Sequence, residues 1–450
     1  RSLIQLSPPK LSDMTIPEIL REKVLTALES LEVVVPDPAR VQVTKAADLR
    51  FGDFQSNIAM MLAKGLGKNP REFAEDLSDR IAAEGLCEIS IAGPGFLNFT
   101  LKAEAWAGLA RSQWESDDLS VSQVKAPQTI VVDFSAPNVA KPMHVGHIRS
   151  TIIGECLSRV ATKIGHKVIK DNHIGDWGTQ FGMVTWAWKK GVDEERLETE
   201  PLQELLRLYR TASDASKEDV GTKEECRAEL VKLQKGDPEN KEIWERCLTL
   251  SRKGLNQIYD RLDVSFDHWM GESAYNDDLA PLVEQLIADD LARESDGAIC
   301  IFSNETGKPK HDPFKINRDG VWQDFPMMIR KSDGAFNYAT TDIATVQHRV
   351  KEWNANHIWY VVDFRQGGHF SQLFDTSKRL GHEEVNLVHV AFGTILGKDG
   401  KPLKTRAGDL PQLEDVLNDA VKAAQIVVDE KSHLETAEEK AALAELIGVN

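Results

Sequence analysis

The chain begins with a region where helical and strand-like hydrophobic patterns follow one another closely. Apolar residues recur at helical spacing over residues 16–31, and the strings IAMMLAKGL and NPREFAEDLSDRI predict two further helices. The string EISIAGPGFLNFTL predicts two short strands joined at a Gly-Pro-Gly turn. We therefore expect a small α+β domain at residues 14–114, with a tail at residues 1–13 before it and a polar linker at residues 115–128 after it.

The pattern then changes to one typical of a parallel sheet. The run TIVVDFS is apolar at successive positions, as in a strand buried on both faces. Residues 145–164 follow with apolar positions at helical spacing and end at Gly165, and HKVIKDNH predicts a second strand. Strand, helix and strand in this order form a βαβ unit, so we expect a parallel sheet with helices on its faces.

Charged helix formers dominate the next part of the chain, which predicts a helical insertion at about residues 191–290. Strand-like runs return at AICIF, VWQDFPMMIR, HIWYVVD and VNLVHVAF, with the helix TDIATVQHRVKEW among them. We expect these runs to resume the same sheet. The closing stretch at residues 411–450 is helical in pattern.

Composition narrows the class of protein. The chain has 450 residues, 41% of them hydrophobic and 28% charged, which is typical of a soluble protein of two or three domains. No run of about 18 apolar residues is present, so we expect no membrane function. The five cysteines are odd in number and form no CxxC pair, which argues against disulfides and a zinc site and favours a reducing compartment. A net charge of -17 argues against phosphate binding over the whole surface but does not exclude a local basic track.

Candidate chemistry lies in DFSAPNVAKPMHVGH, where the first strand breaks and places His144 and His147 around Gly146. The first turn of a helix after a parallel strand presents backbone N–H groups that bind anions. Two histidines three residues apart project on one side of such a turn, which suits nucleotide triphosphate binding. The alternatives are a surface or capping pair, and a metal pair, which the absence of HExxH and of a third ligand disfavours.

Several ordered strings resemble those of arginyl-tRNA synthetases. They are DFSAPNVAKPMHVGHIRSTIIGECLSRV, NHIGDWGTQFGM, KSDGAFNYATTDIATVQHR, DFRQGGHF and GTILGKDGKPLKTRAGDL. Two earlier strings, FGDFQSNIAMMLAKGLGKNP and IAGPGFLNFTL, are similar to the appended N-terminal domain of that family. The resemblance implies an α/β fold: a Rossmann-type catalytic domain at residues 129–410 with its helical insertion, the α+β domain before it, and C-terminal helices that begin a truncated anticodon-binding region at residues 411–450.

The resemblance also implies an ATP site. The string HVGH matches the HIGH signature of class I synthetases, and the matching ATP contacts are His144, Gly146, His147, Gly175, Asp176, Trp177 and Gly178. The second signature, KMSKS, departs from the usual pattern and matches Pro402 to Arg406. A lysine before HIGH compensates in the family, so the group that meets pyrophosphate is left open among Lys141, Lys404 and Arg406. On composition alone, residues 398–406 could be a basic surface turn.

Selection of arginine can be argued physically. A guanidinium ion requires carboxylates that accept its planar fork. Tyr338 and Asp342 are four residues apart at the start of a predicted helix, so their side chains can face one site. Taken alone, Tyr338 would more often be a packing residue and Asp342 a first-turn acid of the helix. The resemblance implies arginine contacts by Asp133, Ser135, Asn138, His144, Tyr338, Asp342 and Gln366.

The implied reaction is that of an arginine--tRNA ligase in translation, with L-arginine, ATP with Mg²⁺, and tRNA(Arg) as substrates and no zinc. In the family, tRNA is usually required even for activation of arginine. We expect a cytoplasmic monomer, or an organellar protein if an N-terminal extension has been removed. Two alternatives remain: an HxGH-type nucleotidyltransferase of small molecules, and a truncated synthetase relative that binds tRNA without charging it.

Overall fold

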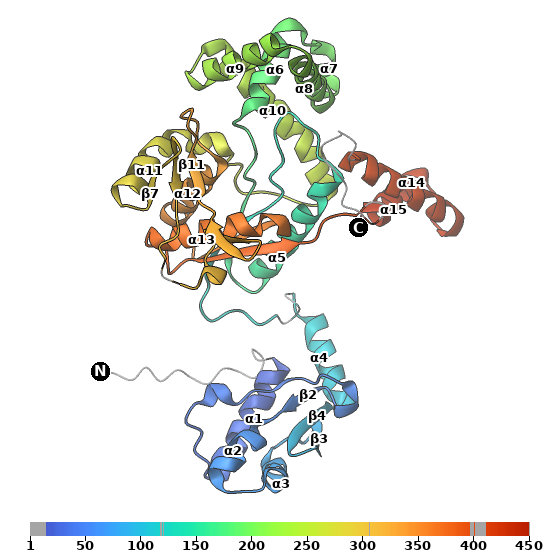
Figure 1. The fold of residues 1–450 in the computed structure, drawn as a ribbon. Coiled ribbons are helices and arrows are strands. Elements are labelled where there is room, and N and C mark those ends of the chain that lie inside the picture. Colours follow the sequence, from blue (N-terminus) through green and yellow to red (C-terminus); the bar gives the residue numbers. More distant parts are fainter. Residues whose placement is uncertain are drawn as a thin grey trace. The chain divides into compact units, whose positions relative to one another are not determined.

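The structure is a computed structural model that describes residues 15–117, 119, 121–305, 307–396, 400 and 411–449. The chain divides into two compact units, Arg1–Lys125 and Ala126–Asn450 (Figure 1). Each unit has its own hydrophobic core, and each is described separately below.

The first unit is a four-stranded antiparallel sheet covered by helices. Its strand order is β1-β2-β4-β3, and the hairpin of β3 and β4 confirms the two strands predicted around the Gly-Pro-Gly turn. Pro70 begins α3, as predicted, because the missing N–H of proline costs nothing in the first helical turn. The elements are α1 (Ile16–Ser30), η2 (Pro38–Arg40), β1 (Thr44–Lys45), η3 (Leu49–Phe51), β2 (Phe54–Ser56), α2 (Ile58–Leu66), α3 (Pro70–Arg80), β3 (Cys87–Ala92), β4 (Phe96–Leu101) and α4 (Ala103–Glu115).

The second unit is built around a four-stranded parallel sheet in the order β13-β12-β5-β6. The strands are β5 (Thr129–Asp133), β6 (Lys167–Asp171), β12 (His357–Asp363) and β13 (Asn386–Phe392). The chain moves from β5 to β6 and later returns to the other side of β5 with β12. The order therefore reverses between β5 and β12, and ligands bind parallel sheets in the crevice at the carboxyl ends of such strands.

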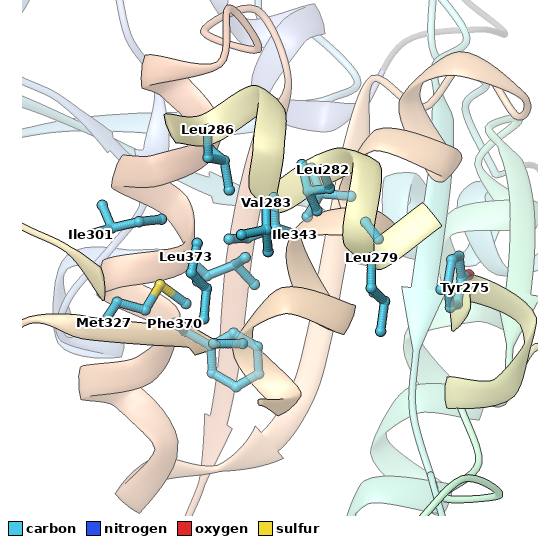
Figure 2. Packing of buried hydrophobic residues seen from close by; sticks show 14 of the residues in the cluster. Tyr275, Leu279, Leu282, Val283, Leu286, Ile301, Met327, Ile343, Phe370 and Leu373 are labelled. Carbon is cyan, nitrogen blue, oxygen red and sulfur yellow. The ribbon is translucent and has the colours of Figure 1, made fainter. Parts of the chain in front are cut away.

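Helices cover both faces of this sheet, and side chains alternate between them. Val131, Ile169 and Ile358 face a core formed with α11 (Asn276–Ala288), α12 (Tyr338–Lys351) and α13 (Gly367–Arg379). Figure 2 shows part of this core, where Leu282, Val283 and Leu286 of α11 approach Ile343 of α12 and Leu373 of α13. On the other face, Ile130 and Val132 contact residues of α5 (Ile148–Lys163) and α10 (Pro238–Arg261). Burial on both faces explains the continuous apolar run of β5.

The predicted helical insertion is present, with its own core around Leu205, Leu208 and Cys247. Its helices are α6 (Thr179–Gly191), α7 (Glu194–Thr199), α8 (Pro201–Glu218), α9 (Val220–Gln234) and α10, followed by η5 (Glu272–Tyr275) and α11. In Figure 1 the helices from α6 to α9 gather together, and α10 leads back from them toward the sheet.

The prediction that AICIF and VWQDFPMMIR resume the parallel sheet was wrong. AICIF forms β8, which pairs antiparallel with β7 and β11 in a separate three-stranded sheet. VWQDFPMMIR divides between β10, which pairs only with β9 in the described sheets, and β11. A short apolar run predicts a strand but does not specify its partner. The strands are β7 (Ala292–Ser295), β8 (Ala298–Ile301), β9 (Lys315–Arg318), β10 (Val321–Asp324) and β11 (Met327–Arg330), with η6 (Pro309–His311) before β9.

The predicted C-terminal helices are α14 (Leu413–Lys431) and α15 (Ala437–Val449). Leu413 and Leu417 join the core on the α5 face of the sheet, and Arg261 of α10 forms an ion pair with Glu445 at 2.8 Å. The α/β architecture with a parallel sheet, a helical insertion and C-terminal helices is thus confirmed. Among the described residues, no helix has the length and apolar character needed to cross a bilayer.

Candidate functional site

The loop after β5 has a backbone that few sequences would adopt. Ser135, Ala136 and Ala140 all have positive φ values, of 71°, 47° and 61°. Residues other than glycine are strained at positive φ, and such strain is concentrated at functional sites, where a particular backbone geometry is needed. The Ser135 hydroxyl lies 2.7 Å from that of Tyr259 and accepts a hydrogen bond from Thr151, so this predicted arginine contact is held inside the protein. The loop is therefore supported at its base by buried hydroxyl groups.

Asn138 lies where this loop meets the turn after β6. Val139 N–H donates to the Gly175 carbonyl at 3.0 Å, and Gly175 N–H donates to the Pro137 carbonyl at 3.1 Å. A Cβ at Gly175 would lie 2.3 Å from Asn138 Oδ1, so a larger residue at position 175 would displace the Asn138 side chain. The two predicted site segments are thus directly paired through their backbones.

The histidines of HVGH form a compact turn, η4 (Val145–His147), directly before α5. Their ring centroids are 3.9 Å apart. His144 Nδ1 accepts from Gly146 N–H, and His147 Nδ1 accepts from His144 N–H, both at 3.1 Å. A neutral ring whose Nδ1 accepts carries its proton on Nε2, as in His144, whereas His147 Nδ1 also lies 3.2 Å from the His144 carbonyl oxygen, so its role depends on the tautomer. The predicted capping alternative is also realised, because the same side chains cap the turn.

Burial keeps both histidines neutral near pH 7. It lowers the pKa of His147 to about 4, and the neighbouring His144 contributes to that shift. Burial also lowers the pKa of His144. The backbone of the turn also pairs with the segment before α14: Val145 N–H donates to the Pro411 carbonyl, and Leu413 N–H donates to the Met143 carbonyl. The turn thus presents neutral N–H donors at the amino end of α5, where the helix dipole favours an anion.

Lys141 lies three residues before this turn, and its Nζ is 4.0 Å from the ring centroid of Tyr209 on α8. This cation–π contact joins the β5 loop to the helical insertion. The other two basic candidates for pyrophosphate, Lys404 and Arg406, lie outside the described residues.

The GDWG turn has a structural role that the sequence did not predict. The Asp176 carboxylate is buried and accepts hydrogen bonds from Ser273 N–H at 2.8 Å and Ser273 Oγ at 2.6 Å. Burial raises the pKa of Asp176. Trp177 makes an edge contact with Trp244 of α10. Gly178 has an extended backbone with φ 179°, which any residue can adopt. Asp176 and Trp177 therefore tie the edge of the sheet to the chain around the helical insertion.

A cavity of about 340 Å³ lies at the carboxyl ends of the strands. It brings together three predicted arginine contacts from separate elements, Tyr338 and Asp342 of α12 and Gln366 of η7 (Phe364–Gln366). Asp133, Ser135, Asn138 and His144 are not among its lining residues. Its other lining residues are His173, Glu272, Thr341, Val362, His369 and Phe370.

Two carboxylates give this cavity its chemistry. Asp342 Oδ2 lies 2.6 Å from His369 Nε2, which orients the carboxylate, and the His369 ring contacts Tyr338 edge-on at 4.8 Å. Burial raises the pKa of Glu272 to about 7, and the nearby charges of Asp176 and Asp342 add to the shift, whereas His173 opposes it. No lysine or arginine is among the described residues that line this cavity, so its two acidic groups suit a positively charged ligand.

Sequence reasoning missed Glu272, His173 and His369. His173 follows the carboxyl end of β6 by two residues, and His369 follows Gln366 by one helical turn, so both could have been found from position. Glu272 lies in a stretch rich in acidic residues and has no comparable local signal.

Comparison with known families settles where the chain belongs. A family model described as tRNA synthetases class I (R), catalytic domain, matches residues 113–450, and one described as Arginyl tRNA synthetase N terminal domain matches residues 18–101. The chain belongs to the class I arginyl-tRNA synthetase family. Both the predicted resemblance and the predicted enzyme class, an aminoacyl-tRNA ligase, are confirmed.

Individual members of the family match over most of this chain. The Arginine--tRNA ligase of Rhodopirellula baltica is 37% identical, covering 97% of this chain and 76% of its own length. That of Picosynechococcus sp. is 41% identical, covering 90% of this chain and 69% of its own length. The crystal structure of arginyl-tRNA synthetase from Plasmodium falciparum matches with a TM-score of 0.71 at 25% identity, covering 98% of this chain and 74% of that one. The Thermus thermophilus synthetase shares the fold, with a TM-score of 0.70 at 21% identity and coverage of 97% and 74%.

Proposed function

We propose that this chain is an arginine--tRNA ligase that joins L-arginine to the 2′-hydroxyl of the terminal adenosine of tRNA(Arg), using ATP. The observation that carries the proposal is the cavity in which Asp342 and Glu272 lie together at the carboxyl ends of the strands. A substrate guanidinium there would neutralise both carboxylates and donate hydrogen bonds to them. His369 would hold the Asp342 carboxylate in place, and Gln366 would meet the polar end of the amino acid.

ATP would bind at the HVGH turn. The Nε2–H groups of His144 and His147 would donate to phosphate oxygens, and the amino end of α5 would add its dipole. Because burial lowers the pKa of both histidines, the neutral imidazoles would donate these hydrogen bonds, and neither ring would need to be protonated before ATP binds. Lys141 would supply a positive charge, and we propose Lys404 and Arg406 as its partners at the pyrophosphate.

The chemistry then requires no protein nucleophile. An oxygen of the arginine carboxylate attacks the α-phosphorus of ATP, the bond to pyrophosphate breaks, and arginyl-adenylate forms. The tRNA 2′-hydroxyl next attacks the carbonyl carbon of the adenylate, its proton passes to the departing phosphate, and AMP leaves with the electrons of the broken C–O bond. Catalysis consists of positioning the reactants and stabilising charge on the phosphates.

We further propose that the nucleotide is MgATP and that the protein is a cytoplasmic monomer. Mg²⁺ commonly binds through substrate phosphates and water rather than through a protein cage. The five cysteines form no CxxC pair, which favours a reducing compartment.

ATP–pyrophosphate exchange by the purified chain tests the proposal. Exchange should depend on arginine, should be strongest with tRNA(Arg) present, and should be followed by formation of arginyl-tRNA. Lysine serves as the control cation. Binding of tRNA without exchange or charging would instead identify a tRNA-binding module. Nucleotidyl transfer to small phosphoesters without any dependence on arginine would identify a nucleotidyltransferase.

A further inference from the structure

Arg349 is a fully buried arginine that the proposed reaction does not use. Its side chain is 0% exposed, and Nη2 donates to Asp133 Oδ2 and to Asp171 Oδ2, each at 2.7 Å. Burial alone would lower the pKa of Arg349, but these two carboxylates raise it well above its ordinary value. The group is therefore a permanent internal cation held between two strands.

The partners of Arg349 lie on a single rung of the parallel sheet. Asp133 of β5 is paired with Asp171 of β6 on one side and with Tyr360 of β12 on the other. The Arg349 guanidinium carbon is 5.5 Å from the centre of the Tyr360 ring. Side chains on one rung point to the same face of a sheet, so Arg349 spans three adjacent strands at one level.

Each of these strands leads directly into the functional site. The chain after β5 reaches the HVGH turn, the chain after β6 reaches His173, and the chain after β12 reaches Gln366. The rung that Arg349 contacts is thus the common base of three loops that carry site residues.

Arg349 itself belongs to α12, the helix that carries Asp342 and Tyr338. Seven residues separate Asp342 from Arg349, which is about two helical turns and places both side chains on the same side of the helix. The helix therefore faces the sheet through Arg349 near its end and faces the cavity through Asp342 near its beginning. A rotation or slide of α12 that broke the Arg349 contacts would also displace Asp342.

We propose that Arg349 is a positioning residue for recognition of the amino acid: it holds α12 against the Tyr360–Asp133–Asp171 rung so that Asp342 and Tyr338 meet Gln366 and His173 at the cavity. The inference rests on the proposed function. It concerns how the proposed arginine pocket on α12 keeps its position relative to the strands that lead to the proposed nucleotide site.

Three variants test this role. R349M removes the guanidinium, and R349K keeps a charge on a side chain one bond shorter. The triple variant D133N/D171N/R349M removes the whole ionic cluster, so that no carboxylate is left unpaired inside the protein. Leu233→Ala, in the core of the helical insertion, is the matched control for loss of stability alone. For each, we would measure the melting temperature, and KM for arginine and for ATP in tRNA-dependent pyrophosphate exchange.

We expect R349M and the triple variant to raise KM for arginine by about tenfold while KM for ATP stays within about twofold. R349K should lie between them and the wild type. L233A should lower the melting temperature and leave both KM values within about twofold. If R349M does not fold, the triple variant and R349K decide the question.

A folded triple variant with the wild-type KM for arginine would overturn the inference, as would KM values for arginine and ATP that rise together. These outcomes are distinct from failure of the proposed function, which would show in the wild type as exchange that does not depend on arginine. In that case a shift in melting temperature on adding arginine still reports whether the cavity binds it, and R349M should reduce that shift.

Discussion

The second unit contains two pairs of acidic side chains: one pair binds a cation of the protein, and the other lines a cavity. Asp133 and Asp171 are buried and share the single guanidinium of Arg349, and burial raises the pKa of Asp133. Asp342 and Glu272 line an open cavity, and within the described part of the chain the close partner of Asp342 is His369. The buried pair therefore binds the side chain of Arg349, whereas the cavity pair can bind a cation from solution.

The difference shows how the same chemistry can serve structure or binding. A buried ion pair costs several kcal/mol to break, because the remaining charge is left without water or a partner. Burial and the nearby carboxylates of Asp176 and Asp342 instead raise the pKa of Glu272, and a cation bound in the cavity would favour its charged form. Replacing Asp342 or Glu272 should therefore act directly on arginine binding, whereas replacing Asp133 alone should act mainly on stability, because Asp171 still pairs with Arg349.

The largest effect is expected from Asp342→Asn. The change keeps the size of the side chain but removes the charge that would face the substrate guanidinium, a loss of roughly 2–4 kcal/mol. Arginine-dependent exchange should fall by about 30- to 1000-fold in kcat/KM. Asp333→Asn, in an exposed turn, is the control and should remain within about twofold. Equal activity of D342N and the wild type would refute the assignment.

Asp133→Asn should act on stability instead. It removes one hydrogen bond to the buried guanidinium and leaves the Arg349–Asp171 pair in place, so the free energy of unfolding in urea should fall by about 2 kcal/mol. Asp263→Asn breaks an ion pair whose aspartate is 90% exposed and should cost less than about 1 kcal/mol. If D133N were as stable as D263N, the buried pair would not have the structural role that its geometry indicates.

Glu272 should give arginine binding a pH dependence. With a pKa of about 7, its carboxylate forms as pH rises, so kcat/KM for arginine should increase by about tenfold between pH 6 and pH 8. Because the folded protein holds this proton more tightly than the unfolded chain, Glu272 should also make stability decrease as pH rises from 4.5 toward 7. Glu272→Gln should flatten both profiles, whereas the exposed Asp278→Asn should preserve them.

The smallest effect is expected from Tyr338→Phe. Tyr338 is 58% exposed, so its hydroxyl competes with water and should contribute only about threefold to KM for arginine. Tyr338→Leu also removes the ring contact with His369 and should therefore raise KM for arginine more than the phenylalanine variant does. The opposite order would show that the aromatic contact does not help to orient His369 and Asp342.

Local pattern was enough to predict much of this site. The apolar periodicity predicted α12, and the spacing of four residues placed Tyr338 and Asp342 on one side of it, where the structure shows them at a common cavity. The HVGH turn followed from the way a parallel strand leads into a helix. These inferences depend only on neighbours within a few residues, which the sequence displays directly.

Partners distant in the sequence could not be predicted in this way. Arg349 meets Asp133 across 216 positions, and no local signal marks that pairing. Glu272 reaches the cavity because its N–H donates to the Ile174 carbonyl after β6, which brings the end of the insertion back to the sheet. The strands β8 and β11 were recognisable as strands, yet their sheet was set by pairing with each other rather than by composition.

The most direct test of the account compares arginine with citrulline, its neutral analogue of nearly the same shape, in pyrophosphate exchange. If Asp342 recognises the charge of the guanidinium, the wild type should prefer arginine strongly, D342N should reduce that preference by at least about 30-fold, and D133N should retain it. A D342N variant with the preference of the wild type would contradict the central claim that the open carboxylate pair selects the substrate.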